Sequence, residues 1–404
     1  MPPARSQRTR EVRLFRLAMA TAALWALDDA FLDRQPGTAP GDHLWGGLVP
    51  VALAVLLALA YPRLRPGARA AAALTAGALM VVVGVADRDQ LTAVVAGLVG
   101  AGLLGLGAVT LWRSRRPGRH LRGLVGAVLA VPVGLFVVLP VGFAIVANHK
   151  ARAPVTRADL GRPYVDVTLR TSDGLKLSGW YVPSRNGAAV IAFPGRRGPI
   201  PHARMLVRHG YGVLLLDRRG EGRSEGDYNA RGWGGEPDLR AALDYLAARP
   251  DVRGGRIGGL GLSVGGEMLL QTAAHDPRLR AVVSEGAGLR SAAEQKHMPG
   301  APAEPLRWIA PITAETAAGV VLSNHLPPPD LVDLMPRIAP RAVLLIRGLK
   351  GNPDEPLNRA YRAAGGPTTE LWEIAGAGHT AGLSTARAEY ERRVVGFFDR
   401  ALAP

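Results

Sequence analysis

The residues of this sequence best suited to chemistry centre on Ser263, which lies in a G-x-S-x-G pattern within residues 259–266. The residues before it, 257–262, favour a short buried strand, and Val264–His275 has helical spacing. A serine in a tight strand-to-helix turn is typical of a nucleophile elbow, in which glycines avoid the clashes that Cβ atoms would cause. We therefore predict that Ser263 is a catalytic nucleophile.

A serine hydroxyl needs a base to accept its proton, and the base needs a carboxylate to orient it. His379 follows the last predicted strand, 370–374, through a glycine-rich loop, and none of the other eight of the nine histidines is placed in this way. We predict that His379 is the base. Three carboxylates are candidates for the acid: Glu355, Asp354 and Glu285. We favour Glu355 because it lies next to a predicted helix, and each of the three could instead cap a helix or face solvent.

Two backbone N–H groups are expected to bind the oxyanion that forms during acyl transfer. One belongs to Val264, next to the nucleophile at the start of a helix. The other is expected from the loop after the predicted strand 188–193, where Pro194 and Gly195 precede Arg196. The charges of the following loop, 217–224, are expected to brace neighbouring loops.

The composition excludes several other chemistries. The chain has 404 residues and no cysteine, which excludes disulfides, a cysteine nucleophile and thiolate metal sites. A dinucleotide fingerprint would need glycine at Val264, and the sequence contains neither a phosphate-binding G-x-x-x-x-G-K-[ST] nor a zinc-binding H-E-x-x-H motif. We predict no cofactor and no metal. The net charge is +16, but no long Lys/Arg run with interleaved aromatics exists, so we do not expect nucleic acid as a partner.

The elements that must position these residues alternate between strand and helix from residue 164 onward. A predicted hairpin, 165–182, opens the domain, and strands and helices then alternate up to a closing helix at 386–402. This pattern predicts an α/β fold with a doubly wound, mostly parallel sheet and an antiparallel start. The alternation stops between residues 287 and 336, where we predict a helical lid over the site.

The first 147 residues are expected to form an all-α membrane module. Five apolar segments match or approach the length that a bilayer-spanning helix needs, although the first is short and carries Arg16, so whether it crosses stays open. Arginine clusters precede the first segment and follow the second and fourth, which places them all on the cytoplasmic side and the C-terminal domain outside the cytoplasm. A linker, 148–163, joins the two parts. The predicted spans are 14–27, 44–61, 70–86, 91–112 and 123–147.

Residues 165–402 resemble the α/β-hydrolase superfamily, above all its serine-peptidase-like and dienelactone-hydrolase-like esterases. The resemblance rests on the elbow at Ser263, on Gly-x-Gly-His at His379, and on the loop 217–224, a D-x-R-G-x-G-x-S motif that includes Arg219. Two positions depart from the family pattern. Pro194 replaces the histidine that usually precedes the oxyanion loop, and Gly351 stands where the family acid is expected.

Together these features predict a multi-pass membrane protein with a serine hydrolase domain that cleaves esters or amides through an acyl-enzyme. The domain is expected to be esterase-like or lipase-like, with a peptidase as the other option. Its expected partners are the lipid bilayer and a small-molecule or lipid-like acyl ester. The alternative is a membrane scaffold or accessory protein with an impaired hydrolase domain, and the displaced acid is the feature that favours it.

Overall fold

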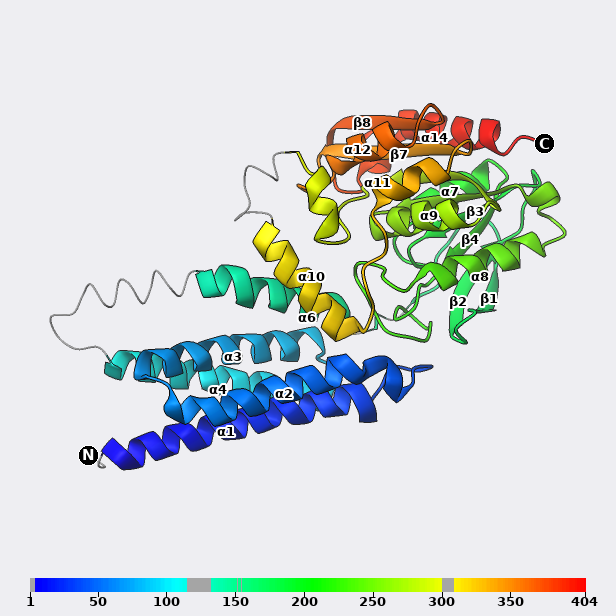
Figure 1. The fold of residues 1–404 in the computed structure, drawn as a ribbon. Helices are drawn as coiled ribbons and strands as arrows, with labels where there is room; N and C mark the ends of the chain where they lie inside the picture. Colours follow the sequence, from blue (N-terminus) through cyan, green and yellow to red (C-terminus); the bar gives the residue numbers. More distant parts are fainter. Residues whose placement is uncertain (1–3, 115–131, 151, 154, 300–308) are drawn as a thin grey trace. The chain divides into compact units, whose positions relative to one another are not determined.

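The computed structural model describes residues 4–114, 132–150, 152–153, 155–299 and 309–404 (Figure 1). The chain forms two compact units. The first contains Met1–Ala151 and Pro305–His325, and the second contains Arg152–Glu304 and Leu326–Pro404. Each unit has its own hydrophobic core, so the two are described separately.

The first unit consists of helices that pack on one another through small residues. A Cβ atom on Gly84 of α3 would lie 2.8 Å from Cα of Gly97 on α4, so the two helix backbones meet closely at this point. This contact is typical of apolar helix pairs in which small residues allow close approach. The helices are α1 (Ala4–Leu27), α2 (Leu44–Ala60), α3 (Pro66–Ala86), α4 (Leu91–Ser114), α6 (Leu139–Asn148) and α10 (Ile309–Ser323), with π-helical turns at Asp28–Leu32 and Gly134–Val138.

Three helical segments of this unit are long and apolar enough to cross a membrane: Pro40–Arg63, Pro66–Ala86 and Leu91–Arg113. They coincide with the second, third and fourth predicted spans. The predicted span 14–27 lies within α1, which is continuous with the arginine-rich start of the chain and is not among the three. The predicted span 123–147 falls partly outside the described residues, and its described part belongs to the shorter apolar segment Gly134–Asn148. The number of spans therefore stays a prediction.

The second unit is built on one eight-stranded sheet in the order β1-β2-β4-β3-β5-β6-β7-β8. Strand β2 pairs antiparallel with both β1 and β4, and the strands from β4 onward are parallel, which confirms the predicted α/β fold and its antiparallel start. The strands are β1 (Val165–Arg170), β2 (Lys176–Val182), β3 (Ala189–Phe193), β4 (Gly212–Leu216), β5 (Ile257–Leu262), β6 (Leu279–Glu285), β7 (Ala342–Lys350) and β8 (Thr369–Gly378).

Helices cover both faces of this sheet (Figure 1). The buried residues of α7 (Ile200–Arg208) and α14 (Arg387–Ala401) share one hydrophobic core with the central strands. Helix α9 (Val264–His275) packs on β5 and β6 and contacts α8 (Glu236–Ala247) and α11 (Leu331–Leu334). Two short helices follow the last strands, α12 (Leu357–Ala364) after β7 and α13 (Gly382–Thr385) after β8. Strands β3 and β4 are buried along their whole length, as central parallel strands should be.

The middle part of the segment predicted as a lid, 287–336, contains helix α10, and the lid stays a prediction. Helix α10 belongs to the first unit, where it packs along α6 and α2. A Cβ on Gly46 of α2 would lie 3.0 Å from the carbonyl oxygen of Leu322, so the contact is close. The physical reason is composition: α10 has one charged residue, Glu315, and is rich in small residues, which suits packing among apolar helices.

The predicted linker, 148–163, belongs to the second unit from Arg152 onward. Leu160 is fully buried in the hydrolase core, and the guanidinium of Arg152 donates hydrogen bonds to the backbone oxygens of Ser224 and Gly226. This part of the linker therefore packs as part of the second unit.

Candidate active site

Ser263 occupies a strained turn between β5 and α9. Its φ is 52° and its ψ is −127°, a combination that a residue with a side chain rarely adopts unless the surrounding structure imposes it. Three neighbouring glycines make the turn possible. Added Cβ atoms on Gly261, Gly265 and Gly266 would lie 2.4, 2.6 and 2.2 Å from Gly266 N, Phe193 O and Ser284 Oγ, respectively. The conformation is that of a nucleophile elbow.

His379 follows the end of β8 and hydrogen-bonds a buried carboxylate. Its Nδ1 lies 2.8 Å from Oε1 of Glu355, whose side chain is 1% exposed. Glu355 is held in turn by the backbone N–H groups of Gly348 (3.2 Å) and Asn352 (2.9 Å). The structure thus brings together His379 and the acid that the sequence favoured.

The unusual position of this acid has a geometric explanation. A Cβ on Gly351 would lie 2.1 Å from Oε1 of Glu355, so the Glu355 carboxylate fills the space beside Gly351. Gly351 is the position where the resemblance places the family acid, and glycine there leaves room for a carboxylate from four residues later. Strands β7 and β8 also extend further than predicted and pair as far as Lys350 and Gly378, which places both loops at one end of the sheet.

The hydrogen bond to Glu355 raises the pKa of His379 above its ordinary value of 6.5, although partial burial of the imidazole acts in the opposite direction. A carboxylate that stabilises the imidazolium in this way also fixes the tautomer, because Nδ1–H donates to Glu355 and Nε2 stays available for a proton.

The other two candidate acids hold loops near the site. Oδ2 of Asp354 accepts the N–H of Leu289 at 2.8 Å, in the loop after β6. Glu285 is buried and accepts hydrogen bonds from the N–H of Gly382 and the hydroxyl of Tyr390, both at 2.7 Å. Neither contacts His379 by a hydrogen bond in the described part of the chain, so both have positioning roles here.

Ser263 and His379 each approach one of two adjacent residues, Glu285 at the end of β6 and Gly286 directly after it. The N–H of Ser263 donates to the carbonyl of Glu285 at 2.7 Å, and a Cβ on Gly286 would lie 3.1 Å from Cε1 of His379. Within the described residues no hydrogen bond joins Ser263 to His379. Catalytic hydrogen bonds are often absent before substrate binds, so this geometry remains compatible with proton transfer.

The two predicted oxyanion donors have different surroundings. Val264 is the first residue of α9, where backbone N–H groups have no acceptor within the helix. Arg196 is buried, and its N–H donates to Oδ1 of Asp217 at 2.7 Å while its guanidinium pairs with Oδ2 of the same carboxylate. The Arg196 N–H would have to leave Asp217 before it could bind a substrate. The sequence offered one signal for this contact, the aspartate that begins the loop 217–224.

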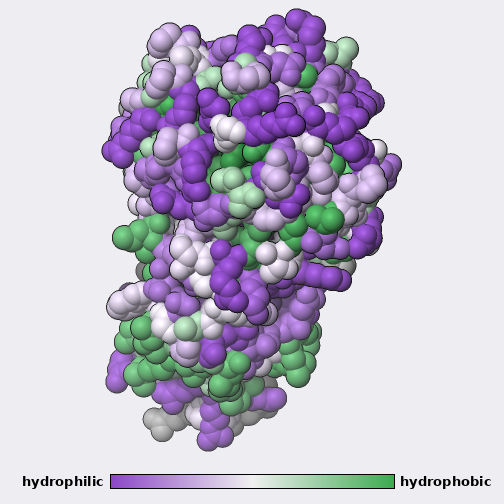
Figure 2. Space-filling view, turned by 90° about the vertical axis from the view of Figure 1, so that its right-hand side faces the viewer, coloured by the Kyte–Doolittle hydropathy of each residue, from purple (hydrophilic) through white to green (hydrophobic). Residues whose placement is uncertain are grey.

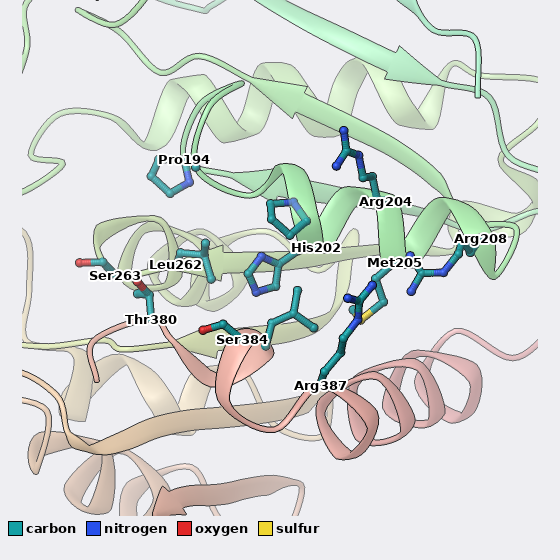
Figure 3. A pocket seen from close by; sticks show the side chains of 13 residues that line it. Pro194, His202, Arg204, Met205, Arg208, Leu262, Ser263, Thr380, Ser384 and Arg387 are labelled. Carbon is teal, nitrogen blue, oxygen red and sulfur yellow. The ribbon is translucent and has the colours of Figure 1, made fainter. Parts of the chain in front are cut away.

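Ser263 lines a pocket of about 740 Å³ between α7 and the segment that contains α13 (Figure 3). Its walls combine apolar residues, among them Pro194, Met205, Leu262 and Leu383, with several polar and basic side chains. The pocket is large enough for a small organic substrate. No group of three or more histidine, aspartate or glutamate side chains that could hold a metal ion is found among the described residues.

Comparisons with known proteins agree with this geometry. Residues 144–320 match the family described as X-Pro dipeptidyl-peptidase (S15 family), a range that includes Ser263 but ends before Glu355 and His379. An alpha/beta hydrolase domain-containing protein, WAV2 of Arabidopsis thaliana, is 36% identical over 121 residues, which are 28% of this chain and 39% of that protein. The thiohydrolase aneE of Aspergillus aculeatus is 27% identical over 195 residues, 46% of this chain and 59% of its own length.

Solved structures show the same fold. An esterase of Pyrococcus furiosus aligns with a TM-score of 0.52 at 22% identity, covering 63% of this chain and 97% of its own. The chain spans less than two thirds of the length of WAV2 and of aneE.

Proposed function

The chain belongs to the α/β-hydrolase superfamily as a serine hydrolase of the esterase-like or peptidase-like kind, and we propose that it cleaves ester or amide bonds through Ser263, His379 and Glu355. The observation that carries the proposal is the 2.8 Å hydrogen bond between His379 and buried Glu355, at the same end of the sheet as the strained Ser263. A base held by a carboxylate is what a serine hydroxyl requires in order to become a nucleophile.

The reaction begins when Ser263 Oγ attacks the carbonyl carbon and His379 Nε2 accepts the hydroxyl proton. The carbonyl oxygen becomes an oxyanion, which the N–H of Val264 stabilises. The bond to the leaving group then breaks, and His379 gives its proton to the departing oxygen or nitrogen, leaving an acyl ester on Ser263. His379 next takes a proton from water, whose oxygen attacks the acyl carbon. The acid product leaves and Ser263 recovers its proton.

The scaffold alternative drew its support from the displaced acid. Glu355 reaches His379 from its unusual position, so that argument loses its basis. We therefore favour an active enzyme over a membrane scaffold with an impaired domain.

The surface of the first unit supports insertion into a bilayer. Many of its large hydrophobic side chains are exposed, for example Leu53 at 55% and Leu98 at 71% (Figure 2). Together with the arginine placement, this favours a multi-pass membrane anchor, a cytoplasmic N-terminus and a hydrolase domain outside the cytoplasm. An enzyme held at a bilayer would meet lipid-like acyl esters, which we propose as its substrates. Faster cleavage of lipid-free peptides than of acyl esters would contradict this substrate class.

The catalytic proposal is tested by labelling with a fluorophosphonate probe. The detergent-solubilised full chain should be labelled, and labelling should disappear in both Ser263→Ala and His379→Ala. Ser384→Ala is the matched control, because Ser384 lines the same pocket without a base beside it, and it should be labelled like the wild type. A folded wild-type protein that stays unlabelled would overturn the proposal.

The orientation is tested separately by a reporter fused after Lys150. Reporter activity on the extracytoplasmic side is expected. A cytoplasmic reading would overturn the five-span arrangement without bearing on the chemistry.

A further inference from the structure

The pocket beside Ser263 has basic side chains on its walls and no acidic ones. Of the 13 residues that line it, three are arginines and one is a histidine, and none is aspartate or glutamate. Arg204 and Arg208 lie on α7, four residues apart and therefore on one face of the helix, and Arg387 begins α14. Figure 3 shows Ser263 at one end of the pocket and Arg208 and Arg387 at the other.

Two of these arginines have no carboxylate partner among the residues that the structure describes. Arg208 pairs with Glu391 at 2.8 Å. Arg204 uses its Nε to donate to the backbone oxygen of Asp159, which leaves its two terminal nitrogens available. Arg387 makes no hydrogen bond or ion pair within the described chain, and it is exposed to the pocket. The positive charge at this end is therefore only partly neutralised.

The position of Arg387 in its helix adds to the positive charge that is not neutralised. It is the first residue of α14, where the helix dipole already presents partial positive charge and a cation is unfavourable. The one acidic residue of the first turn, Glu389, pairs with Arg392 and Arg393 rather than with Arg387. An anionic ligand would offset both the guanidinium and the helix terminus.

A buried histidine in the pocket wall also lacks a hydrogen-bond partner. His202 is 4% exposed, and neither of its ring nitrogens makes a hydrogen bond in the structure. Its Nε2 lies 3.6 Å from Oε2 of Glu285, too far for a hydrogen bond but close enough to orient the ring. Because Nε2 faces the Glu285 carboxylate, only Nδ1 lacks a polar partner among the described residues, and buried polar atoms are normally paired.

We infer that this pocket selects acyl esters whose acyl chain ends in a carboxylate or phosphate-type anion, with that anion held by Arg387. Met205, Leu262 and Leu383 would contact the intervening methylene groups, and the forked guanidinium of Arg387 would bind the anion in a bidentate way. The inference rests on the proposed function, since the acyl chain is placed by the attack of Ser263 on its carbonyl carbon.

The experiment compares p-nitrophenyl esters that differ at the far end of the acyl chain. The monoesters of succinate, glutarate, adipate and suberate are set against the matching esters that end in a primary amide, which has the same shape and no charge. A phosphonate-ended series separates a carboxylate preference from a phosphate preference. Release of p-nitrophenol is measured for the full chain in detergent, for Arg387→Gln, Arg387→Glu and Arg204→Gln, and for Arg392→Gln.

Arg392→Gln is the matched control, because Arg392 lies on the same helix outside the pocket. The wild type and this control should prefer one anionic series over its amide partners on the order of tenfold in kcat/KM, mainly through KM. Arg387→Gln should lose most of that preference, Arg387→Glu should reverse it, and Arg204→Gln should retain it, because Arg204 points away from Arg387. Added salt should weaken the preference.

Equal hydrolysis of anionic and amide-ended esters by the wild type would overturn the inference while leaving the proposed function intact. A preference that Arg387→Gln and Arg392→Gln reduce equally would also overturn it, because net charge rather than the pocket would then be responsible. If no ester of any series were hydrolysed, both the proposed function and this inference would fail.

Discussion

The two units of this protein distribute their hydrophobic residues in opposite ways. Among the described residues, the large hydrophobic side chains that are exposed all belong to the first unit except Val165, Leu326 and Leu349. In the second unit, strands β3 and β4 are buried throughout, and aromatic and branched residues fill one core. Figure 2 shows hydrophobic residues gathered over part of the first unit's surface, while the second unit's surface in this view is mostly hydrophilic.

The interiors differ as well. The buried residues of the first unit include many alanines, together with glycines such as Gly77 and Gly100 where helices meet. The second unit is stabilised by burial of large apolar side chains away from water. Helices that expose large residues and pack through small ones are typical of proteins whose solvent is lipid. One chain therefore contains two kinds of hydrophobic packing. That of the second unit suits water, and that of the first unit is compatible with a lipid environment.

The largest expected effect is a loss of catalytic activity in the second unit. Replacing the acid in Glu355→Gln should lower kcat/KM for a p-nitrophenyl ester by on the order of 10³–10⁴, because the amide no longer holds His379 in the productive tautomer. Asp354→Asn is the matched control, since Asp354 holds the loop at Leu289, and it should cost about tenfold or less. Similar losses in the two variants would mean that the structure assigns the acid incorrectly.

The solvent difference itself is tested by adding a charge to each unit. Leu53 and Leu349 have similar exposure, 55% and 49%. Leu53→Arg should raise the apparent free energy of membrane insertion by about 3 kcal/mol, measured with a glycosylation reporter. Leu349→Arg should change the stability of the second unit by about 0.5 kcal/mol or less. An equally small effect of Leu53→Arg would indicate that this surface faces water.

Disrupting the packing between small residues in the first unit should have a smaller effect, which is on thermal stability. Gly84→Ala places a Cβ 2.8 Å from Cα of Gly97, and because that neighbour is backbone the two helices must separate. We expect a loss of about 1–3 kcal/mol in resistance to thermal unfolding in detergent. Gly102→Ala on α4, where a Cβ would meet nothing within 4 Å, should be neutral or slightly stabilising. Equal losses would show that helix contact is not the cause.

The smallest effect is a pH dependence confined to the second unit. His379 must be neutral to accept a proton, and its pKa is raised above 6.5 by the hydrogen bond to Glu355. The acid limb of kcat/KM should therefore have its midpoint above pH 6.5, with activity falling about tenfold per pH unit below it. Residual activity of Glu355→Gln should show a midpoint shifted to lower pH, because the raising contact is lost. An unshifted midpoint would mean that the acid limb of the pH profile reports the titration of a residue other than His379.

Some features were predictable because they depend on neighbours in the sequence. The limits of β5 and α9 follow from an apolar run, a glycine-flanked serine and helical spacing, and the predicted ranges agree with the structure. His379 was predictable for the same reason, since it follows the last strand through a glycine loop. Three of the predicted spans needed nothing beyond length and apolar composition.

Other features depended on residues that are distant in the sequence. Helix α10 comes between β6 and β7 in the sequence, and nothing in its own residues indicates that it packs with α6. The N–H of Arg196 was expected to be free, yet it donates to Asp217, which is 21 residues away. The basic end of the pocket joins side chains of α7 and α14, which periodicity alone assigns to two unrelated helices.

The sequence by itself determined where strands and helices begin, which serine and histidine are suited to catalysis, and which part of the chain is apolar, because periodicity, glycine turns and composition act over a few residues. The tertiary structure alone decided which of three carboxylates reaches His379. That choice depends on the space beside Gly351 and on the joint extension of β7 and β8, both of which arise when residues far apart in the chain are brought into contact.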